Sequence, residues 1–154
     1  MNKKTVSIIL LIIFLITVVL TVANVFLSDE NTEINQTETL TVENKTVNYE
    51  KAGKCLEVID GNTIQVYGIG KVQLTQIGLT EGDASFAQAK DFVSEKCLGK
   101  TVYLDVDDKQ PKDKYGRTLA IVYTNDTNVN KELLKNNLAK VSYFEPSEFE
   151  KGLD

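Results

Sequence analysis

A long run of apolar residues near the N-terminus constrains the fold of this chain more than any other feature. Residues 5–27 contain no charged residue, no glycine and no proline. As a helix, these 23 residues would span roughly 34 Å at ~1.5 Å per residue, against about 30 Å for the hydrocarbon core of a bilayer. A buried helix of a globular domain is rarely so long and so uniform. The run therefore predicts one transmembrane helix, which acts as a signal anchor.

The charges beside this run predict its orientation. Lys3 and Lys4 precede it, and two acidic residues follow it. The positive-inside rule then makes residues 1–4 a cytoplasmic tip and places the rest of a single-pass membrane protein outside the cytoplasm. A cleaved signal peptide is the competing interpretation, because residues 21–23 (TVA) resemble a small-residue cleavage site.

The segment that follows, residues 28–51, has few apolar residues and is rich in Thr, Asn and Glu. Its residues 28–50 carry a net charge of −5. Polar composition and self-repulsion predict a flexible acidic linker here. Glycosylation sequons at Asn35, Asn44 and Asn125 fit an extracytoplasmic location, if the organism glycosylates its proteins.

Charge and composition exclude several classes of function for the remainder. Residues 51–154 have a net charge of −2 and contain the chain's one arginine, Arg117. Proteins that bind duplex DNA tightly need a basic surface to neutralise phosphates, and this composition does not suggest one. The chain has no histidine, which excludes His-based zinc sites and Ser-His or Cys-His catalysis.

Two cysteines, Cys55 and Cys97, are too few to complete a four-ligand metal site alone. In an exported domain they are a candidate disulfide. Two buried free thiols are the alternative interpretation.

Hydrophobic periodicity predicts the fold of residues 52–154. Alternating segments predict strands, and segments with helical spacing predict amphipathic helices, the second of them capped by Asn128 or Asn130. The expected strands are 54–59, 63–67, 72–77, 100–106 and 119–123, and the expected helices are 83–98, 129–139 and a short turn at 146–148. Three strands, a helix, two strands and a helix are typical of a mixed β-barrel with helices, the five-stranded Greek-key OB-fold.

Three segments carry a more specific signal. They read VIDGNTIQV from Val58 to Val66, DKYGRTLAIVY from Asp113 to Tyr123, and VNKELLKNNLAKVSYF from Val129 to Phe144. Together, in this order, they resemble the staphylococcal nuclease (thermonuclease) family, over roughly residues 52–150. The resemblance implies an OB-fold domain and calcium-dependent hydrolysis of phosphodiester bonds in DNA or RNA.

The resemblance also implies which residues form the active site. The family holds one calcium ion with the second aspartate of a D-G-D turn and the aspartate of a D-T-P-E segment. Here the turn reads Asp60-Gly61-Asn62, so Asn62 is a weak, neutral metal ligand and Asp60 supports the turn. The D-T-P-E segment aligns with residues 78–81, where Gly78 takes the place of the ligand aspartate.

Two catalytic positions of the family are retained, Glu81 and Arg117. The resemblance implies that Glu81 orients the attacking water and that Arg117 stabilises charge on the phosphate. The family's other arginine is replaced by Gln73, and only two residues separate Glu81 from the next helix. Asp83 is a helix N-cap or a substitute ligand. Alternatively, Arg117 only stabilises the fold, by pairing with Glu81 or with the solvated acidic cluster Asp105, Asp107 and Asp108.

These replacements predict that the thermonuclease-like domain is catalytically impaired and has no cofactor. Together with the apolar run at residues 5–27, they predict a membrane-anchored binding or interaction module. Loss of one transition-state donor costs on the order of 10²–10³ in rate. The alternative is a divergent endonuclease that uses Ca²⁺ with Asp60, Glu81, Asp83 and Arg117. Expected partners are the membrane and either single-stranded nucleic acid or a protein, and a domain with no nucleic-acid role also remains open. Tyrosines offer candidate base-stacking surfaces: Tyr67, Tyr103, Tyr115, Tyr123 and Tyr143.

Overall fold

The computed structural model describes residues 37–80, 82, 84–149 and 151. The predicted transmembrane helix, residues 5–27, lies outside these ranges, as does the first part of the predicted linker. Among the residues that are described, no helix is long and apolar enough to cross a bilayer.

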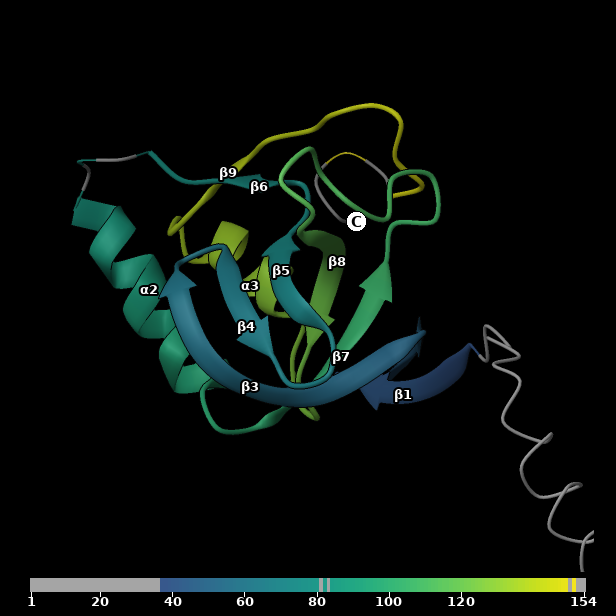
Figure 1. The fold of residues 1–154 in the computed structure, drawn as a ribbon. Coiled ribbons are helices and arrows are strands. Elements are labelled where there is room, and N and C mark those ends of the chain that lie inside the picture. The colour runs from purple at the N-terminus through teal and green to yellow at the C-terminus, as the bar shows by residue number, and fades with distance from the viewer. Residues whose placement is uncertain (1–36, 81, 83, 150, 152–154) are drawn as a thin grey trace, which may run out of the picture. The chain divides into compact units, whose positions relative to one another are not determined.

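A closed barrel of five strands forms the centre of the domain (Figure 1). The strand order is β3-β4-β5-β8-β7, and β7 pairs again with β3. The β5–β8 pair is parallel and the other pairs are antiparallel. The strands are β3 (Lys51–Asp60), β4 (Thr63–Val66), β5 (Gly70–Leu74), β7 (Thr101–Val106) and β8 (Thr118–Tyr123). The predicted mixed barrel is confirmed, with its last two strands exchanged in spatial order, as a Greek key requires.

The barrel interior follows from the alternation of apolar residues. On β5, Val72 and Leu74 are fully buried, whereas Lys71 and Gln73 point to the outer face. Successive side chains of a strand point to opposite faces, so β5 has an apolar inner row and a polar outer row, whereas β8 is buried on both faces. The inner row is completed by Ile64, Val66, Val102, Leu104, Ala120 and Val122.

Helix α2 (Ala84–Cys97) covers one end of the barrel with one apolar face. It buries Ala89, Val93 and Cys97, which lie one turn apart on the same side. The turn at Gly61 approaches this face so closely that a Cβ atom added to Gly61 would lie 2.5 Å from the Cβ atom of Ala89. Glycine is therefore required here by contact with the helix.

Helix α3 (Val129–Lys135) is shorter than predicted. Asn128 caps its start, where its side chain accepts a hydrogen bond from the backbone N–H of Lys131. The helix ends four residues before the predicted boundary, because Asn136 bonds back to Glu132 through its side chain and Asn137 adopts a positive φ of 57°. The described part of the chain thus contains two helices, and the short turn predicted at 146–148 is not helical.

Asn130 joins α3 to the barrel. It is fully buried, its Nδ2 atom donates to the carbonyl oxygen of Thr75 (2.9 Å), and its Oδ1 atom accepts from the backbone N–H of Val122 (2.9 Å). Buried amides are stable when their donors and acceptors are paired in this way. The side chain therefore supports the end of β5, where the candidate site begins.

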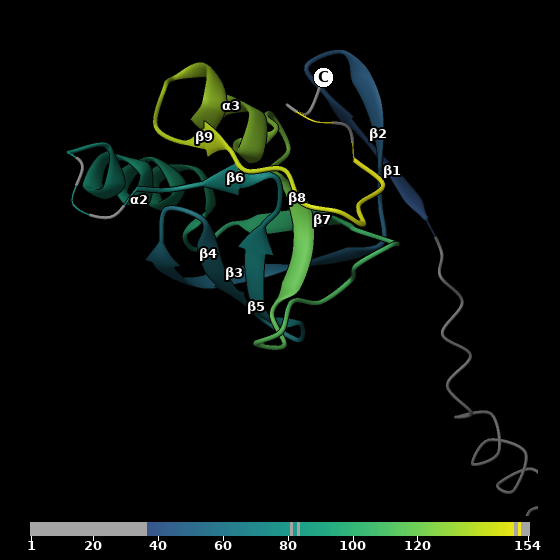
Figure 2. The ribbon, with the colours of Figure 1, turned by 90° about the horizontal axis from the view of Figure 1, so that it is seen from above.

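The prediction of a flexible linker is wrong for its second half. Strands β1 (Glu38–Val42) and β2 (Lys45–Tyr49) form a hairpin that packs beside the barrel (Figure 2). Val42 is buried in the common core, and the ring of Tyr49 meets the ring of Tyr103 edge-on, with 5.0 Å between centroids. Alternating apolar residues within a polar composition form one sheet face, and tertiary packing stabilises it.

Candidate functional site

A cleft of about 300 Å³ lies on the outer side of β5 and the start of β8. The loop between β7 and β8 forms one wall, and the C-terminal segment after β9 forms another. The cleft is lined by Gln73, Gln110, Asp113, Tyr115, Arg117 and Phe144, among others. These residues come from segments far apart in the sequence, so the barrel topology brings the predicted site position Arg117 beside Gln73 and Phe144.

Arg117 is held in a fixed geometry by Asp113. Its Nε and Nη2 atoms both lie 2.7 Å from Oδ2 of Asp113, and its Nη1 atom lies 3.4 Å from Oγ1 of Thr63. The alternative in which this arginine pairs with the acidic cluster Asp105, Asp107 and Asp108 is therefore wrong, and its other suggested partner, Glu81, lies outside the described residues. Its partner is the carboxylate four residues earlier, and the i,i+4 spacing in DKYGR was the available sequence signal.

Asp113 also shapes the loop. Its Oδ1 atom accepts hydrogen bonds from the backbone N–H groups of Tyr115 and Arg117, each at 2.9 Å. Burial opposes ionisation of Asp113, but the backbone and side-chain hydrogen bonds from Arg117 outweigh it and lower the pKa of this carboxyl group. Asp113 is therefore an ionised anchor for the guanidinium group.

The Asp60-Gly61-Asn62 turn meets the same site. Oδ1 of Asp60 accepts from the backbone N–H of Asn62 (2.8 Å) and closes the turn. Oδ1 of Asn62 accepts from Oγ1 of Thr63 (3.2 Å), the hydroxyl group that also lies beside Arg117. The amide oxygen of Asn62 is thus already hydrogen bonded within the protein.

Gly78 lies in a second small sheet. Strands β6 (Ile77–Gly78) and β9 (Lys140–Val141) pair with Gly78 opposite Lys140. A Cβ atom added to Gly78 would lie 3.0 Å from the Cβ atom of Ser142. The position where the family resemblance expects a carboxylate ligand is thus closely packed by the C-terminal segment.

The described residues do not fit a calcium ion at this site. Calcium prefers six to eight oxygen ligands, several of them anionic. Asn62 supplies one neutral, engaged oxygen and Gly78 supplies no side chain. Across the described ranges, no group of three or more His, Cys, Asp or Glu residues could hold a metal ion. The predicted catalytic residue Glu81 and the candidate ligand Asp83 lie outside those ranges.

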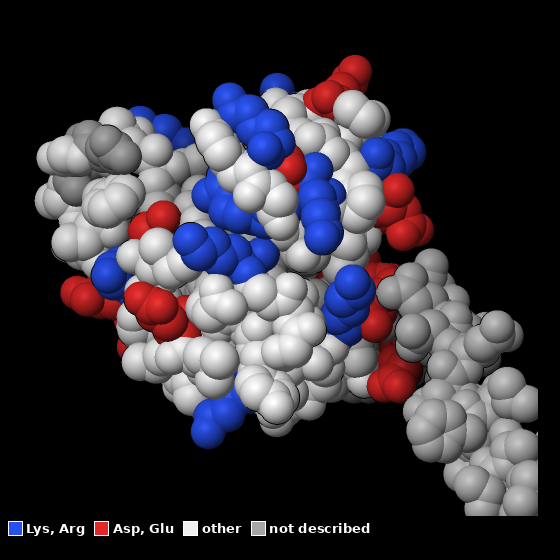
Figure 3. All heavy atoms as spheres, viewed as in Figure 1, with Lys and Arg blue, Asp and Glu red and all other residues white. Residues whose placement is uncertain are grey.

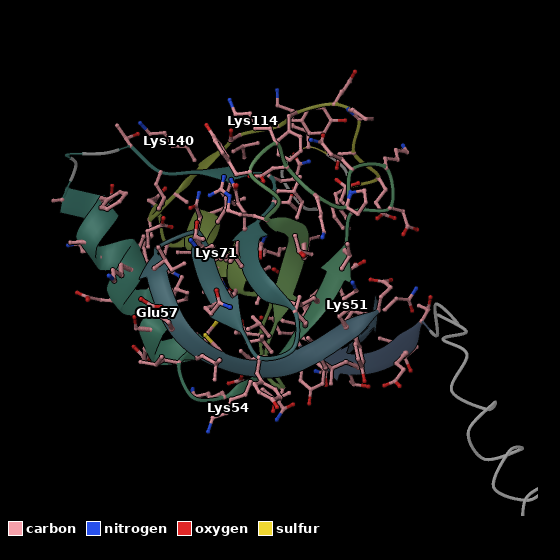
Figure 4. The ribbon with its side chains drawn as sticks, in the orientation of Figure 1. Lys51, Lys54, Glu57, Lys71, Lys114 and Lys140 are labelled. Atoms are coloured by element: carbon pink, nitrogen blue, oxygen red, sulfur yellow. The ribbon has the colours of Figure 1, made fainter. Side chains whose placement is uncertain are left out.

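Positive charge gathers around the cleft, although the chain as a whole carries −5. Figure 3 shows several Lys and Arg side chains on the face that carries the site, with acidic side chains mostly toward its edges. Lys71, Lys114 and Lys140 lie on this face (Figure 4), and all three are exposed. The net charge of the chain did not predict this basic face, because it sums all residues, whereas the fold places several basic residues on one surface.

Tyr115 stands between two of the cations. Its side chain is 71% exposed, with Nζ of Lys114 at 5.0 Å from the ring centroid and Cζ of Arg117 at 5.4 Å. Of the other predicted stacking tyrosines, Tyr123 is buried and Tyr103 packs on Tyr49. Tyr67 and Tyr143 are exposed.

The acidic cluster at the end of β7 is only partly solvated: Asp108 is exposed, as predicted, and Asp105 is half-buried. Asp107 is fully buried and accepts hydrogen bonds from Oγ of Ser147 (2.6 Å) and from three backbone N–H groups, those of Lys109, Gln110 and Glu148. Ser147 in turn accepts from Nε2 of Gln76 (2.9 Å). This network ties the C-terminal segment to the barrel and so fixes Phe144 over the cleft.

Cys55 and Cys97 are free, fully buried thiols. The predicted disulfide is therefore not formed in this structure, and the alternative reading of two buried thiols describes it. Cys55 lies on β3 and Cys97 at the end of α2, where both fill the interface between strand and helix. Burial, followed by the nearby Cys55, raises the pKa of Cys97 to about 12.

Comparison with known proteins identifies the family. The family model described as Staphylococcal nuclease homologue matches residues 71–153. This chain belongs to the staphylococcal nuclease family. The resemblance found in the three sequence segments is thereby confirmed.

Several relatives are similar to this chain. The Thermonuclease of Staphylococcus hyicus is 36% identical over 108 residues, which cover 64% of this chain and 63% of the relative. Endonuclease YncB of Bacillus subtilis is 34% identical over 104 residues, 58% of this chain and 47% of the relative. The Uncharacterized protein MJ1439 of Methanocaldococcus jannaschii is 31% identical over 120 residues, 58% of each chain. The matched regions span less than two thirds of these relatives' lengths.

Proposed function

We propose that this staphylococcal nuclease homologue binds the backbone of single-stranded nucleic acid in the cleft over β5 and β8, with little hydrolysis. The observation that supports this most directly is the exposed Tyr115 ring between Lys114 and Arg117. An aromatic ring for a base, next to cations for phosphates, is how proteins bind single strands with little sequence preference.

The guanidinium group is suited to phosphate. Asp113 holds Nε and Nη2 of Arg117, so Nη1 makes only a long contact, to Oγ1 of Thr63. A guanidinium group fixed in this way loses little side-chain entropy when it binds an oxyanion. Lys114, which is exposed beside it, adds a second positive charge.

Three replacements argue for weak hydrolysis. Asn62, Gln73 and Gly78 stand where the family resemblance expects two carboxylates and an arginine. Phosphoryl transfer depends on positioned positive charge around the reacting phosphate. The two carboxylates would hold a calcium ion and the arginine would add a charge of its own. A neutral amide at Asn62, a bare backbone at Gly78 and a neutral glutamine at Gln73 do neither, so the site favours binding over turnover.

A divergent metal-dependent endonuclease is the second candidate. Family membership and the similarity to a Thermonuclease and to Endonuclease YncB favour it. In this case Arg117 supplies positive charge to the phosphate, and Asp60, Glu81 and Asp83 supply the carboxylates. The two candidates share the same cleft and differ only in whether the bound strand is cut.

We also propose that residues 5–27 anchor the domain to the outer face of the cytoplasmic membrane. The length of the apolar run and the lysines before it support this arrangement. The full chain should then stay with the membrane fraction through an alkaline wash. Release into the wash would contradict the anchor.

Binding is tested with the full chain and a fluorescent oligothymidylate, by anisotropy in low salt with a chelator present. Tyr115→Ala should weaken binding roughly 5- to 150-fold, since stacking on one aromatic ring is worth about 1–3 kcal/mol. Lys114→Ala should weaken it less and reduce its salt dependence. Lys90→Ala, which removes an exposed lysine from α2, is the matched control and should change neither the affinity nor its salt dependence.

Cleavage is tested with the same chain and oligonucleotide, with calcium or with chelator. Binding without cleavage supports the first candidate. Calcium-dependent cleavage that Arg117→Ala abolishes, in a variant whose thermal unfolding shows it is folded, supports the second. A wild-type chain that neither binds nor cuts single strands would rule out both.

A further inference from the structure

A second exposed aromatic side chain lies outside the cleft on the same face of the sheet. Tyr67, in the turn between β4 and β5, is 72% exposed. We propose that Tyr67, Lys71 and Lys54 form an outer contact for single-stranded nucleic acid, which continues the cleft along the outer face of β5. This inference rests on the proposed function of the cleft, and it predicts a bound strand of several nucleotides.

The alternation of β5 connects the two places. Val72 and Leu74 point into the core, so Lys71 and Gln73 share the outer face. Gln73 lines the cleft, and Lys71 follows it at roughly 6.6 Å along the strand, two residues at ~3.3 Å each. A strand that leaves the cleft along β5 therefore meets Lys71 next.

The neighbouring strand β4 continues this path toward the turn. Gln65 lies opposite Lys71 in the antiparallel register, and Val66 points into the core. By the same alternation, Gln65 and Tyr67 share the outer face. The outer row of polar side chains therefore ends at an exposed aromatic ring.

The Tyr67 backbone is held firmly although its ring is free. Its N–H group donates to the carbonyl oxygen of Lys54 on β3 (2.9 Å). A Cβ atom added to Gly53 would lie only 2.6 Å from the carbonyl oxygen of Tyr67, so the turn packs directly on β3. A ring on a fixed backbone loses little entropy on stacking, and the same contacts place Lys54 beside it.

Charge on this face fits a polyanion. Figure 4 shows Lys114, Lys71 and Lys54 in sequence from the rim of the cleft to the opposite edge of the barrel. All three are exposed. Glu57, which lies opposite Gln65 on β3, is an acidic residue near this row, and in Figure 4 it lies to one side of the three lysines. Single lysines next to exposed rings suit a single strand with unpaired bases.

The test compares two oligothymidylates, one of about 3 nucleotides and one of about 12, within the range of site sizes for an OB barrel. Affinities are measured by anisotropy with the full chain and a chelator. Wild type should bind the longer strand at least tenfold more tightly. Tyr67→Ala should lower the affinity for the longer strand about tenfold and leave the affinity for the shorter strand unchanged. Tyr67→Phe should leave both affinities unchanged.

Lys71→Ala provides a second, independent variant. It should lower the slope of log affinity against log salt for the longer strand by about 0.7, as expected for one phosphate on a single strand. Lys90→Ala on α2 is the charge-matched control and should leave that slope unchanged. Both Tyr67 and Lys71 are exposed, so these variants should keep the unfolding transition of wild type.

The outcomes separate this inference from the proposed function. If wild type binds neither oligonucleotide, the proposed function fails and this inference fails with it. The outer contact is overturned if wild type binds both lengths equally, or if Tyr67→Ala and Lys71→Ala leave binding of the longer strand unchanged. In that case the cleft alone binds the strand.

Discussion

Substitution of Gly61 tests the contact that positions the site turn against α2. An alanine Cβ atom at this position would lie 2.5 Å from the Cβ atom of Ala89 and 3.0 Å from two backbone atoms of the helix, the carbonyl carbon of Ala89 and the nitrogen of Lys90. Carbon atoms pack best at roughly 3.5–4.0 Å, so the closest pair is short by about 1 Å. No side-chain rotation relieves this overlap, because Cβ atoms do not move with rotamers.

The expected cost of Gly61→Ala is about 1–3 kcal/mol of unfolding free energy, the usual range for overpacking. Ala89→Gly alone should cost about 1–2 kcal/mol, since glycine is unfavourable inside a helix and the change also removes a fully buried methyl group. In the double variant the shortest contact is gone, but the two backbone contacts at 3.0 Å remain. The double variant should therefore be more stable than the sum of the single changes predicts, by roughly 0.5–1 kcal/mol.

Urea unfolding of the full chain, followed by far-UV circular dichroism, measures all four members of this cycle. Ala87→Gly is the matched control, because Ala87 is exposed on the same helix; combined with Gly61→Ala it should be additive. If the Gly61–Ala89 cycle were additive within about 0.3 kcal/mol, close contact with α2 would not be the reason for glycine in the turn.

Two further predictions concern the site and the acidic cluster. The first variant combines four changes: Asn62→Asp, Gln73→Arg, Gly78→Asp, and Ser142→Gly to relieve the 3.0 Å contact at Gly78. It should cleave single-stranded DNA in a calcium-dependent way, at a rate at least about 10³-fold above that of the parent chain. A folded but inactive variant would show that these side chains are not what limits hydrolysis. Burial, and then the carboxylates of Glu50, Glu148, Asp108 and Asp107, raise the pKa of Asp105 to about 7, above the unfolded value of about 3.9. The folded chain therefore binds more protons between these values, and its stability should fall as pH rises from about 4 to 7. Asp105→Asn should flatten this dependence in urea titrations at pH 5 and pH 8, and an unchanged slope would assign it to another group.

Local sequence determined the barrel strands and helix α2 of this domain. Apolar alternation on β4, β5 and β7, the apolar run of β8 and helical spacing in α2 predicted the barrel and its first helix, because these signals arise within a few residues. The segments at 58–66, 113–123 and 129–144 identified the family for a related reason, since each places several specific residues in one stretch.

Tertiary structure decided which distant residues each segment and polar side chain contacts. The hairpin at residues 38–49 was hidden by polar composition, and its stability comes from packing of Val42 and Tyr49 on distant residues. Asp107 looked solvated but is bonded to Ser147, forty residues away. The end of α3 likewise depends on side-chain bonds of Asn136 that periodicity does not report.

The candidate site divides in the same way. The sequence alone determined that two carboxylates and an arginine of the family are missing, because side-chain chemistry is read directly from residue identity. Only the folded chain decided that Arg117 is bound by Asp113, that Ser142 packs against Gly78, and that Lys114 lies beside the exposed ring of Tyr115. Such relations depend on strand register and barrel closure, which bring distant residues together and which no local pattern encodes.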